Sequence, residues 1–190
     1  MAMTSRSAPS GSRPERKPRP ALDGPALEAL ALHYVARFAT SGAKLADYCR
    51  RKLRERGWEG PAAPDVPALV ARFVAAGYID DAAYAKGRGE GLRRRGYGDR
   101  RVEAALRGAG IGDEDRAGAK GDLAEAWTAA LVLARKRRLG PFAADLPDRE
   151  RRAKQLGTML RGGHPLDIAR EIINAPSEAE ALRRAGEAQE

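Results

Sequence analysis

The chain has 190 residues, of which 43% are hydrophobic but only 5% aromatic, and 35 Lys and Arg face 26 Asp and Glu. The net charge of +9 indicates an anionic partner, either nucleic acid or the acidic face of a protein. A single cysteine excludes an intramolecular disulfide, and no apolar run approaches the roughly 20 residues of a membrane span. The basic N-terminus also lacks the apolar core of a signal peptide. We therefore expect a cytoplasmic protein with no membrane partner.

Residues 1–24 are rich in Ser, Pro, Gly and Arg and show no periodicity, so we predict a disordered basic tail. From Pro25 onward, apolar residues recur at helical spacing, while the alternation typical of strands is almost absent. Ser41, Asp65 and Asp148 are favourable N-cap residues for three of the predicted helices. The fold class that follows is all-α.

Further helices are predicted at about 81–95, 99–109 and 122–138. The first of these contains Gly87, Gly89 and Gly91, and each glycine costs a helix about 0.8–1.0 kcal/mol relative to alanine. No strand precedes them, and a GxGxxG motif would require glycine at Leu92, so they do not form a nucleotide loop. We expect either a weakened helix or one that a neighbouring element approaches closely.

The stretch around Gly77 predicts the end of one helix and the start of the next. Gly77 can adopt the left-handed conformation of a Schellman close, in which Tyr78 folds back onto Phe73. Asp80 is a good N-cap, and Asp81 falls in the first turn, where the helix dipole favours an acid. These residues predict a rigid joint between two helices.

One pattern recurs along the chain: an apolar residue, three others, a glycine and then a large residue. Besides Gly77, it includes Gly57, Gly110 and Gly163, which are spaced by 53 residues each time, and we expect a Schellman close at each. The spacing predicts three related helical units, which would stack into an elongated, curved, all-α array. The expected divisions are repeats at 25–80, 81–122 and 123–176, followed by a mixed-charge C-terminal tail, helical or frayed, at 177–190.

The sequence offers little for an enzyme. His33 and His164 are far apart and have no cysteine ligands nearby, so no zinc spacing exists. No serine motif marks a nucleophile. We expect a non-enzymatic protein with no metal and no cofactor, in which His164 makes a capping contact.

Three basic clusters remain as candidate binding residues. They comprise Arg50 and Arg54; Arg93, Arg94, Arg95, Arg100 and Arg101 with Tyr97; and Arg135, Arg137 and Arg138. Arginine suits bidentate pairing with phosphate or carboxylate, and the glycines beside Tyr97 would admit a backbone or a phosphate. Such runs can also be solvated faces, and charge alone does not distinguish nucleic acid from an acidic protein as the partner.

The motifs of the central stretch closely resemble the RecX family of regulatory proteins. They are Gly77-Tyr78-Ile79-Asp80-Asp81 with Tyr84-Ala85, and Arg95-Gly96-Tyr97-Gly98 with Arg101-Val102, Leu106 and Gly110-Ile111. Residues 43–58 and 152–173 are similar to the other two repeats of the family, and the resemblance covers about 26–175. The glycines in the predicted helix at 81–95 and the basic N-terminal tail depart from the family pattern.

The resemblance implies that each unit is one of several tandem three-helix repeats. It also implies a regulator, which we expect to be monomeric, that binds RecA filaments on single-stranded DNA. Members of the family inhibit or modulate the ATPase, strand exchange and coprotease activities of RecA in recombination, DNA repair and the SOS response. The alternative is a free-standing helix–turn–helix protein that uses Arg93–Arg101 to bind duplex DNA.

Overall fold

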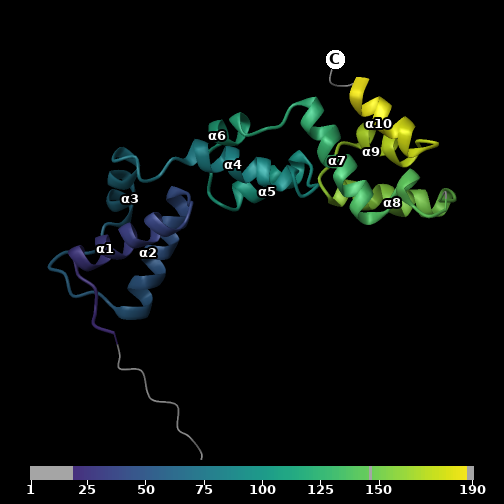
Figure 1. Ribbon diagram of the computed structural model, residues 1–190. Coiled ribbons are helices and arrows are strands. Elements are labelled where there is room, and N and C mark those ends of the chain that lie inside the picture. The colour runs from purple at the N-terminus through teal and green to yellow at the C-terminus, as the bar shows by residue number, and fades with distance from the viewer. Residues whose placement is uncertain (1–18, 146, 188–190) are drawn as a thin grey trace, which may run out of the picture.

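The computed structural model describes residues 19–145 and 147–187, which form α-helices and one short 3-10 helix in an elongated, bent row (Figure 1). The prediction of an all-α fold is confirmed. Residues 1–18, which hold most of the predicted basic tail, lie outside the described residues. The helices in chain order are α1 (Gly24–Arg37), α2 (Gly42–Arg56), α3 (Val66–Ala75), α4 (Asp81–Arg93), α5 (Asp99–Arg107), α6 (Asp113–Gly118), α7 (Leu123–Arg137), η1 (Gly140–Phe142), α8 (Arg149–Arg161), α9 (Leu166–Ile173) and α10 (Glu178–Glu187).

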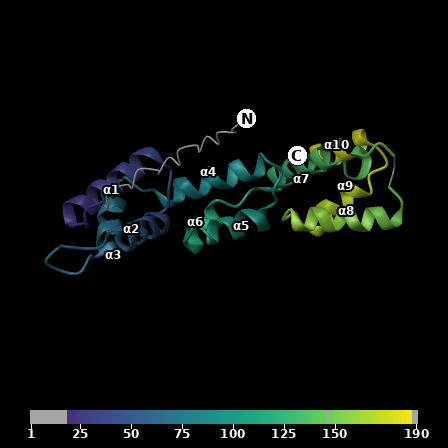
Figure 2. The same ribbon diagram turned by 90° about the horizontal axis from the view of Figure 1, so that it is seen from below.

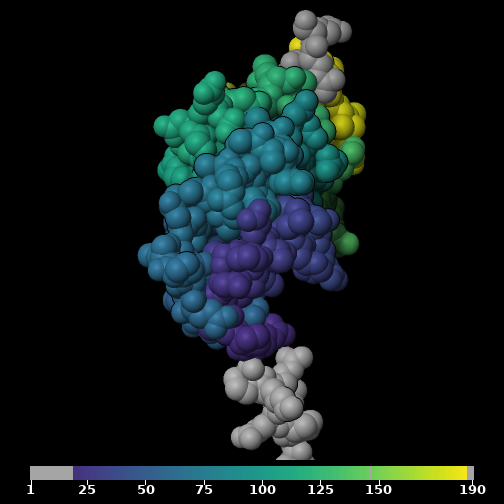
Figure 3. All heavy atoms as spheres, turned by 90° about the vertical axis from the view of Figure 1, so that its left-hand side faces the viewer, coloured from purple at the N-terminus to yellow at the C-terminus, as the bar shows by residue number. Residues whose placement is uncertain are grey.

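The buried apolar side chains form three separate clusters, each drawn from one continuous stretch of chain. The clusters lie within 22–79, 84–119 and 126–185. We call these stretches the first unit (α1–α3), the second unit (α4–α6) and the third unit (α7–α10). Figure 2 shows α1, α4 and α7 along one edge of the row and α2, α5 and α8 along the other. Figure 3 views the row from the end of the first unit, with the later units above and behind it.

The second helices of the units lie end to end. At the first joint, the Ser41 hydroxyl at the start of α2 donates to the Ala109 carbonyl after α5, at 2.6 Å. At the second joint, the start of α5 meets the end of α8 in the same way, and the Gly98 and Arg100 amides donate to the carbonyls of Gly162 and Gly163 at 2.9 and 3.2 Å. Each positive helix N-terminus therefore faces the negative C-terminal turn of the next second helix.

The helices mostly end as the glycine pattern predicts. The Tyr78 amide donates to the Phe73 carbonyl at 2.9 Å, with Gly77 at φ +74°, and the two aromatic rings lie 5.5 Å apart. The same arrangement of bonds closes α4, α5 and α8 at Gly96, Gly110 and Gly163. The Schellman prediction is confirmed at Gly77, Gly110 and Gly163, and Gly96 adds a close that was not predicted.

Gly57 is different, and its predicted Schellman close is wrong. Its ψ of 177° leads the chain straight on, so that Trp58 forms an isolated parallel bridge with Leu22. The amides of Leu22 and Glu59 donate to the carbonyls of Gly57 and Leu22 at 3.1 and 2.9 Å. Within the described residues, this N-terminal segment covers the end of α2, whereas the ends of α5 and α8 contact the preceding unit.

Leu22 also corrects the predicted boundary of the N-terminal tail. Its side chain is completely buried in the first cluster, and the Asp23 carboxylate caps α1 by accepting from the Ala26 amide at 2.8 Å. The described part of the predicted tail is therefore structured from Leu22 onward, because this single leucine in a Pro- and Ser-rich stretch packs at the C-terminal end of α2.

The helix glycines of α4 have different surroundings. A Cβ atom on Gly89 would lie 3.2 Å from the Ala119 carbonyl oxygen and 3.3 Å from Val102 Cγ1, so α5 and the end of α6 approach α4 closely here. Gly87 and Gly91 meet no comparable obstruction. Close packing thus accounts for Gly89 alone.

Residues 178–187 are part of the third unit, so the alternative of a frayed tail is wrong; residues 188–190 lie outside the described part. Helix α10 buries Ala181 and Ala185 in the third cluster and contacts α7 and α9. Two alanines four residues apart form one narrow face of a helix, which allows it to pack closely on its neighbours.

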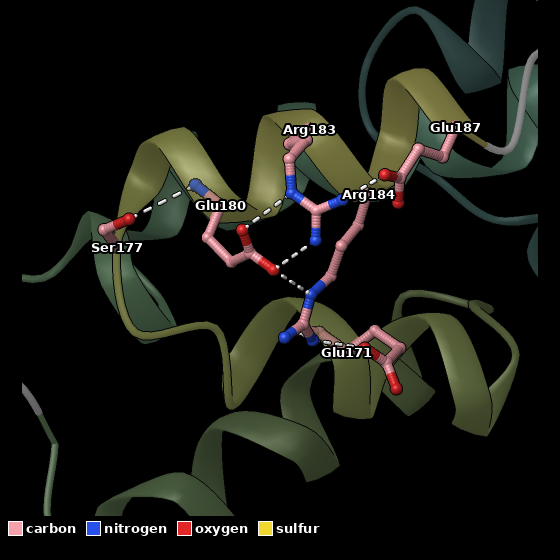
Figure 4. A network of polar contacts seen from close by, with 6 residues as sticks. All are labelled: Glu171, Ser177, Glu180, Arg183, Arg184 and Glu187. Atoms are coloured by element: carbon pink, nitrogen blue, oxygen red, sulfur yellow. Dashed lines mark hydrogen bonds and ion pairs between the residues drawn. The ribbon is translucent and has the colours of Figure 1, made fainter.

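A polar network fastens α10 on its outer side (Figure 4). Glu180 accepts from Arg183 at 2.7 Å and from Arg184 at 2.9 Å. Arg184 reaches across to Glu171 on α9, and Arg183 also pairs with Glu187. The hydrogen bonds from Arg183 and then Arg184 lower the pKa of Glu180 to about 2, so this carboxylate stays ionised at physiological pH.

Candidate partner-binding surface

Positive charge is concentrated in the end-to-end helices. Helix α2 has six Lys and Arg against two acids, α5 has three against two, and α8 has five against one. We call α2, α5 and α8 together the basic row, and it runs along one edge of the molecule (Figure 2). Its exposed cations that form no ion pair within the described residues are Arg54, Arg100, Arg101, Arg149, Arg151 and Arg161.

Arg93 is not a surface residue, so it is poorly placed for the partner contact predicted for it. Only 7% of it is exposed, and its guanidinium donates to the Asp99 carboxylate at 3.1 Å and to the Ala119 carbonyl at 3.0 Å. A third acid, Glu125, lies 3.7 Å away at the start of α7. Arg93 therefore ties α4 to three other segments, because a buried arginine needs several polar partners.

The neighbouring arginines are exposed, as a binding role requires. Arg94 lies 3.8 Å from Glu90, and Arg95 donates to the Gly91 carbonyl at 3.0 Å. The Arg101 guanidinium lies 5.4 Å from the centre of the Tyr97 ring, within the range of a cation–π contact. Arg100 and Arg101, at the start of α5, lie at the second joint.

The glycines beside Tyr97 admit a backbone rather than a phosphate. A Cβ atom on Gly98 would lie 2.5 Å from the Gly163 carbonyl carbon and 2.6 Å from the His164 amide. His164 is fully buried, and its Nε2 lies 3.1 Å from the Gly96 carbonyl oxygen. Burial lowers the pKa of His164, so the ring is neutral at physiological pH. The Arg-Gly-Tyr-Gly motif therefore forms the second joint.

The acidic motif helps to form the first joint. The Asp80 carboxylate caps α4 by accepting from the Ala83 amide at 2.8 Å. Asp81 instead reaches back to the first unit and accepts from the Gly42 amide at the start of α2, at 2.9 Å. Lys44 lies 5.3 Å from the centre of the Tyr84 ring, so a second contact also crosses from α2 to α4.

The outer two predicted clusters occupy different places. Arg50 pairs with Asp47 at 3.3 Å on α2, whereas Arg54 is free of ion pairs among the described residues; both belong to the basic row. Arg135 and Arg138 are at the end of α7, outside the row. Arg135 pairs with Glu178 of α10 at 2.7 Å.

The last turn of α7 partly serves the fold. Arg138 has φ +53° and closes the helix, with the Leu139 amide donating to the Ala134 carbonyl at 2.8 Å. Arg137 is exposed between these two arginines. The predicted cluster at 135–138 is therefore the C-terminal end of α7, where Arg135 pairs with α10 and Arg138 ends the helix in the left-handed conformation. Arg137 is the predicted member with neither of these structural roles.

Sequence reasoning missed the cations of α8, above all Arg149, Arg151 and Arg161. A signal for them exists. The 53-residue spacing of Gly57, Gly110 and Gly163 aligns α8 with α2 and α5, whose arginines are on the predicted list. Extending the predicted basic clusters by that spacing would have included α8.

Within residues 19–145 and 147–187, His, Cys, Asp and Glu do not gather into a group that could hold a metal ion. In the same residues, no helix has both the length and the apolarity to cross a bilayer. The observed site is a long, charged surface instead.

The fold and this surface define a class: an all-α tandem-repeat protein with a basic row along one edge. No family model matches the chain. It is 34% identical over 158 residues to the regulatory protein RecX of Myxococcus xanthus, a match that covers 78% of this chain and 84% of that protein. It is also 29% identical over 153 residues to the regulatory protein RecX of Agrobacterium fabrum, covering 78% and 82%.

Solved structures agree in fold. The crystal structure of RecX from Lactobacillus salivarius matches with a TM-score of 0.57 at 19% identity, over 77% of this chain and 92% of that one. A second crystal structure of a regulatory protein RecX matches with a TM-score of 0.54 at 21% identity, over 78% and 72%. The chain belongs to the RecX family of regulatory proteins, as its central motifs predict.

Proposed function

We propose that this protein is a non-enzymatic regulator in the cytoplasm that binds RecA filaments on single-stranded DNA and restrains their ATPase, strand exchange and coprotease activities. The observation that carries the proposal is the 34% identity, over most of both chains, to a regulatory protein RecX. The basic row supports it, because unpaired cations along an extended edge suit an extended anionic partner.

The geometry favours a filament over a compact partner. The three units follow one another in a row, and each contributes a second helix with excess positive charge. Contacts distributed over such an array are collectively strong only when the partner is long enough to meet several of them at once. An assembled filament satisfies this condition better than a free subunit.

The alternative helix–turn–helix function is less well supported. A recognition helix reads base edges with its N-terminal residues. The corresponding end of α5 is occupied, because the Gly98 and Arg100 amides donate to the carbonyls of Gly162 and Gly163. Binding of duplex DNA in the absence of RecA, with a sequence preference, would instead favour this alternative.

The test measures ATP hydrolysis by RecA on single-stranded DNA with increasing amounts of the full-length chain. We expect the rate to fall, and an unchanged rate at several-fold excess over the filament would contradict the proposal. A variant with Arg100→Ala, Arg101→Ala and Arg161→Ala should inhibit at least ~10-fold less well, since removing each charge-assisted contact costs about 1 kcal/mol or more. A control with Arg72→Ala, Lys86→Ala and Arg88→Ala removes equal charge outside the basic row and should inhibit normally.

A further inference from the structure

Two grooves recur at the same place in successive units. In the second unit, a groove between α5 and α6 encloses about 230 Å³ over Val102 and Leu106, with Ala117 on its lip. In the third unit, a groove between α8 and α9 encloses about 120 Å³ over Leu156 and Ile173. Each therefore has an apolar floor between the second and third helices of its unit.

The repeat makes the two grooves equivalent. Moving along the chain by the 53-residue spacing converts lining residue Arg100 into Ala153, and Lys120 into Ile173, which line the other groove. Asp99, Glu103 and Ala117 convert in the same way into Arg152, Leu156 and Arg170. The two units thus have a groove at equivalent positions of the repeat, although different side chains line it.

Both rims carry positive charge. The acids of the α5–α6 groove are already engaged: Asp99 pairs with Arg93, and Glu103 accepts from Arg116 at 2.8 Å and from Arg107 at 3.0 Å. Arg116 foremost, and then Arg107, lower the pKa of Glu103, which therefore remains ionised and paired. Arg100 and Lys120 form no ion pair within the described residues.

The α8–α9 groove has the same polarity without any acid in its lining. Arg152 and Arg170 stand on its two sides, and neither forms an ion pair within the described part of the chain. Arg152 donates one bond, to the Pro147 carbonyl at 2.9 Å. Each groove thus combines an apolar floor with two rim cations that form no ion pair within the described residues.

We propose that these two grooves are equivalent docking sites for an acidic partner protein, each taking one apolar side chain flanked by carboxylates, and that together they fit a partner presenting this motif repeatedly. The apolar side chain fills the floor, while its acidic neighbours pair with the rim cations. Nucleic acid fits less well, because no aromatic ring lines either groove to stack on a base.

The inference rests on the proposed function in one respect, since a filament presents the same protomer surface at regular intervals. A partner that meets both grooves gains from the second contact through effective concentration, without any new kind of interaction. A partner with a single copy of the motif has no such gain.

The direct test uses peptides as probes. One peptide carries a central leucine with glutamates on each side, and a second carries two such motifs joined by flexible Gly/Ser linkers of increasing length. Fluorescence anisotropy should show the best tandem peptide binding at least ~100-fold more tightly than the single one. Replacing leucine by serine in both motifs should remove most of that binding.

Two variants fill the grooves without disturbing buried residues, because Ala117 and Ala153 are exposed on the lips. Either Ala117→Phe or Ala153→Phe should reduce tandem binding to the level of the single motif, and both together should abolish it. Ala104→Phe is the matched control, since Ala104 is exposed on α5 outside the groove lining.

Equal binding of leucine and serine peptides would overturn the inference, as would a tandem peptide that binds no better than a single one. The inference would also be overturned if the groove variants weakened the binding of an oligo(dT) strand as much as the binding of the peptide. Parallel RecA assays separate the two proposals. If the groove variants inhibit RecA normally and bind the peptides as the unchanged chain does, the docking proposal is wrong and the proposed function stands. If the unchanged chain does not affect RecA but binds tandem peptides through the grooves, the proposed function is wrong and the docking proposal stands.

Discussion

The second joint can be tested by adding one methyl group. Gly98 has φ −80° and ψ 168°, an extended conformation that alanine also adopts, so Gly98→Ala introduces no backbone strain of its own. The new Cβ would lie 2.5 Å from the Gly163 carbonyl carbon and 2.6 Å from the His164 nitrogen. Both are backbone atoms that cannot rotate away, so the third unit must move by roughly 1 Å to restore ordinary contact.

The magnitude follows from what that movement disturbs. Overpacking of this kind costs about 1–3 kcal/mol. The shift also stretches the bonds from the Gly98 and Arg100 amides to Gly162 and Gly163, each worth about 1 kcal/mol. We expect Gly98→Ala to destabilise the joint by about 3 kcal/mol, with the loss felt mainly in the third unit.

Gly112→Ala provides a matched control. Gly112 is also the N-cap of a helix without a side-chain capping bond, has φ −63° and ψ 163°, and has nothing within 4 Å of its Cβ position. Any intrinsic penalty for alanine at an N-cap therefore appears equally in both variants. Urea unfolding followed by circular dichroism reports on all units, and Trp127 fluorescence reports on the third cluster.

Agreement of the two variants within about 0.5 kcal/mol would refute the reasoning, because that is the usual scale of an inconsequential surface change. It would mean that Gly98 is not pressed against the Gly163 turn in solution. A loss of stability seen only in the fluorescence of Trp58, which packs in the first cluster, would also contradict the assignment.

Other predictions test individual side chains. Arg138→Gly should stabilise the chain by about 1 kcal/mol, because φ +53° strains arginine but not glycine; an unchanged thermal midpoint would contradict the left-handed close. Burial lowers the pKa of His164 below 6.5, so the unfolded chain binds more protons and stability falls as pH drops from 6.5 toward the lowered value, by at most about 1.4 kcal/mol per pH unit. His164→Gln should flatten this part of the pH dependence in urea titrations, and an identical slope would argue against a neutral buried ring. Burial raises the pKa of the Cys49 thiol to about 11, so iodoacetamide at pH 8 should react no faster than the chain unfolds; rapid alkylation in the absence of urea would show that the site is open.

The ends of helices could be predicted because they depend on neighbours in sequence. The Gly77 close involves residues 73–78, and the Asp80 cap bonds to an amide three residues later. The all-α fold and its repeat were accessible for the same reason. At Gly57 the local pattern fails because its outcome depends on Leu22, which lies far away in sequence.

The candidate site was harder to predict for a similar reason. A run of three arginines does not reveal which side chain points inward, and the partners of Arg93 come from three other segments. The close packing at Gly98 depends on a turn some 65 residues away. The cations of α8, by contrast, were within reach of the repeat spacing.

The separation of the hydrophobic clusters also determines the order in which the molecule can assemble. Each cluster is complete within one continuous stretch, 22–79, 84–119 or 126–185, so a core can close as soon as its own unit has left the ribosome. The joints obey a different schedule, since the bonds Ser41–Ala109 and Gly96–His164 each connect residues 68 positions apart. A joint can therefore form only after the second helix of the following unit has been synthesised to its end. We therefore expect each core to form in chain order during synthesis, and each joint to form only after the second helix of the following unit is complete.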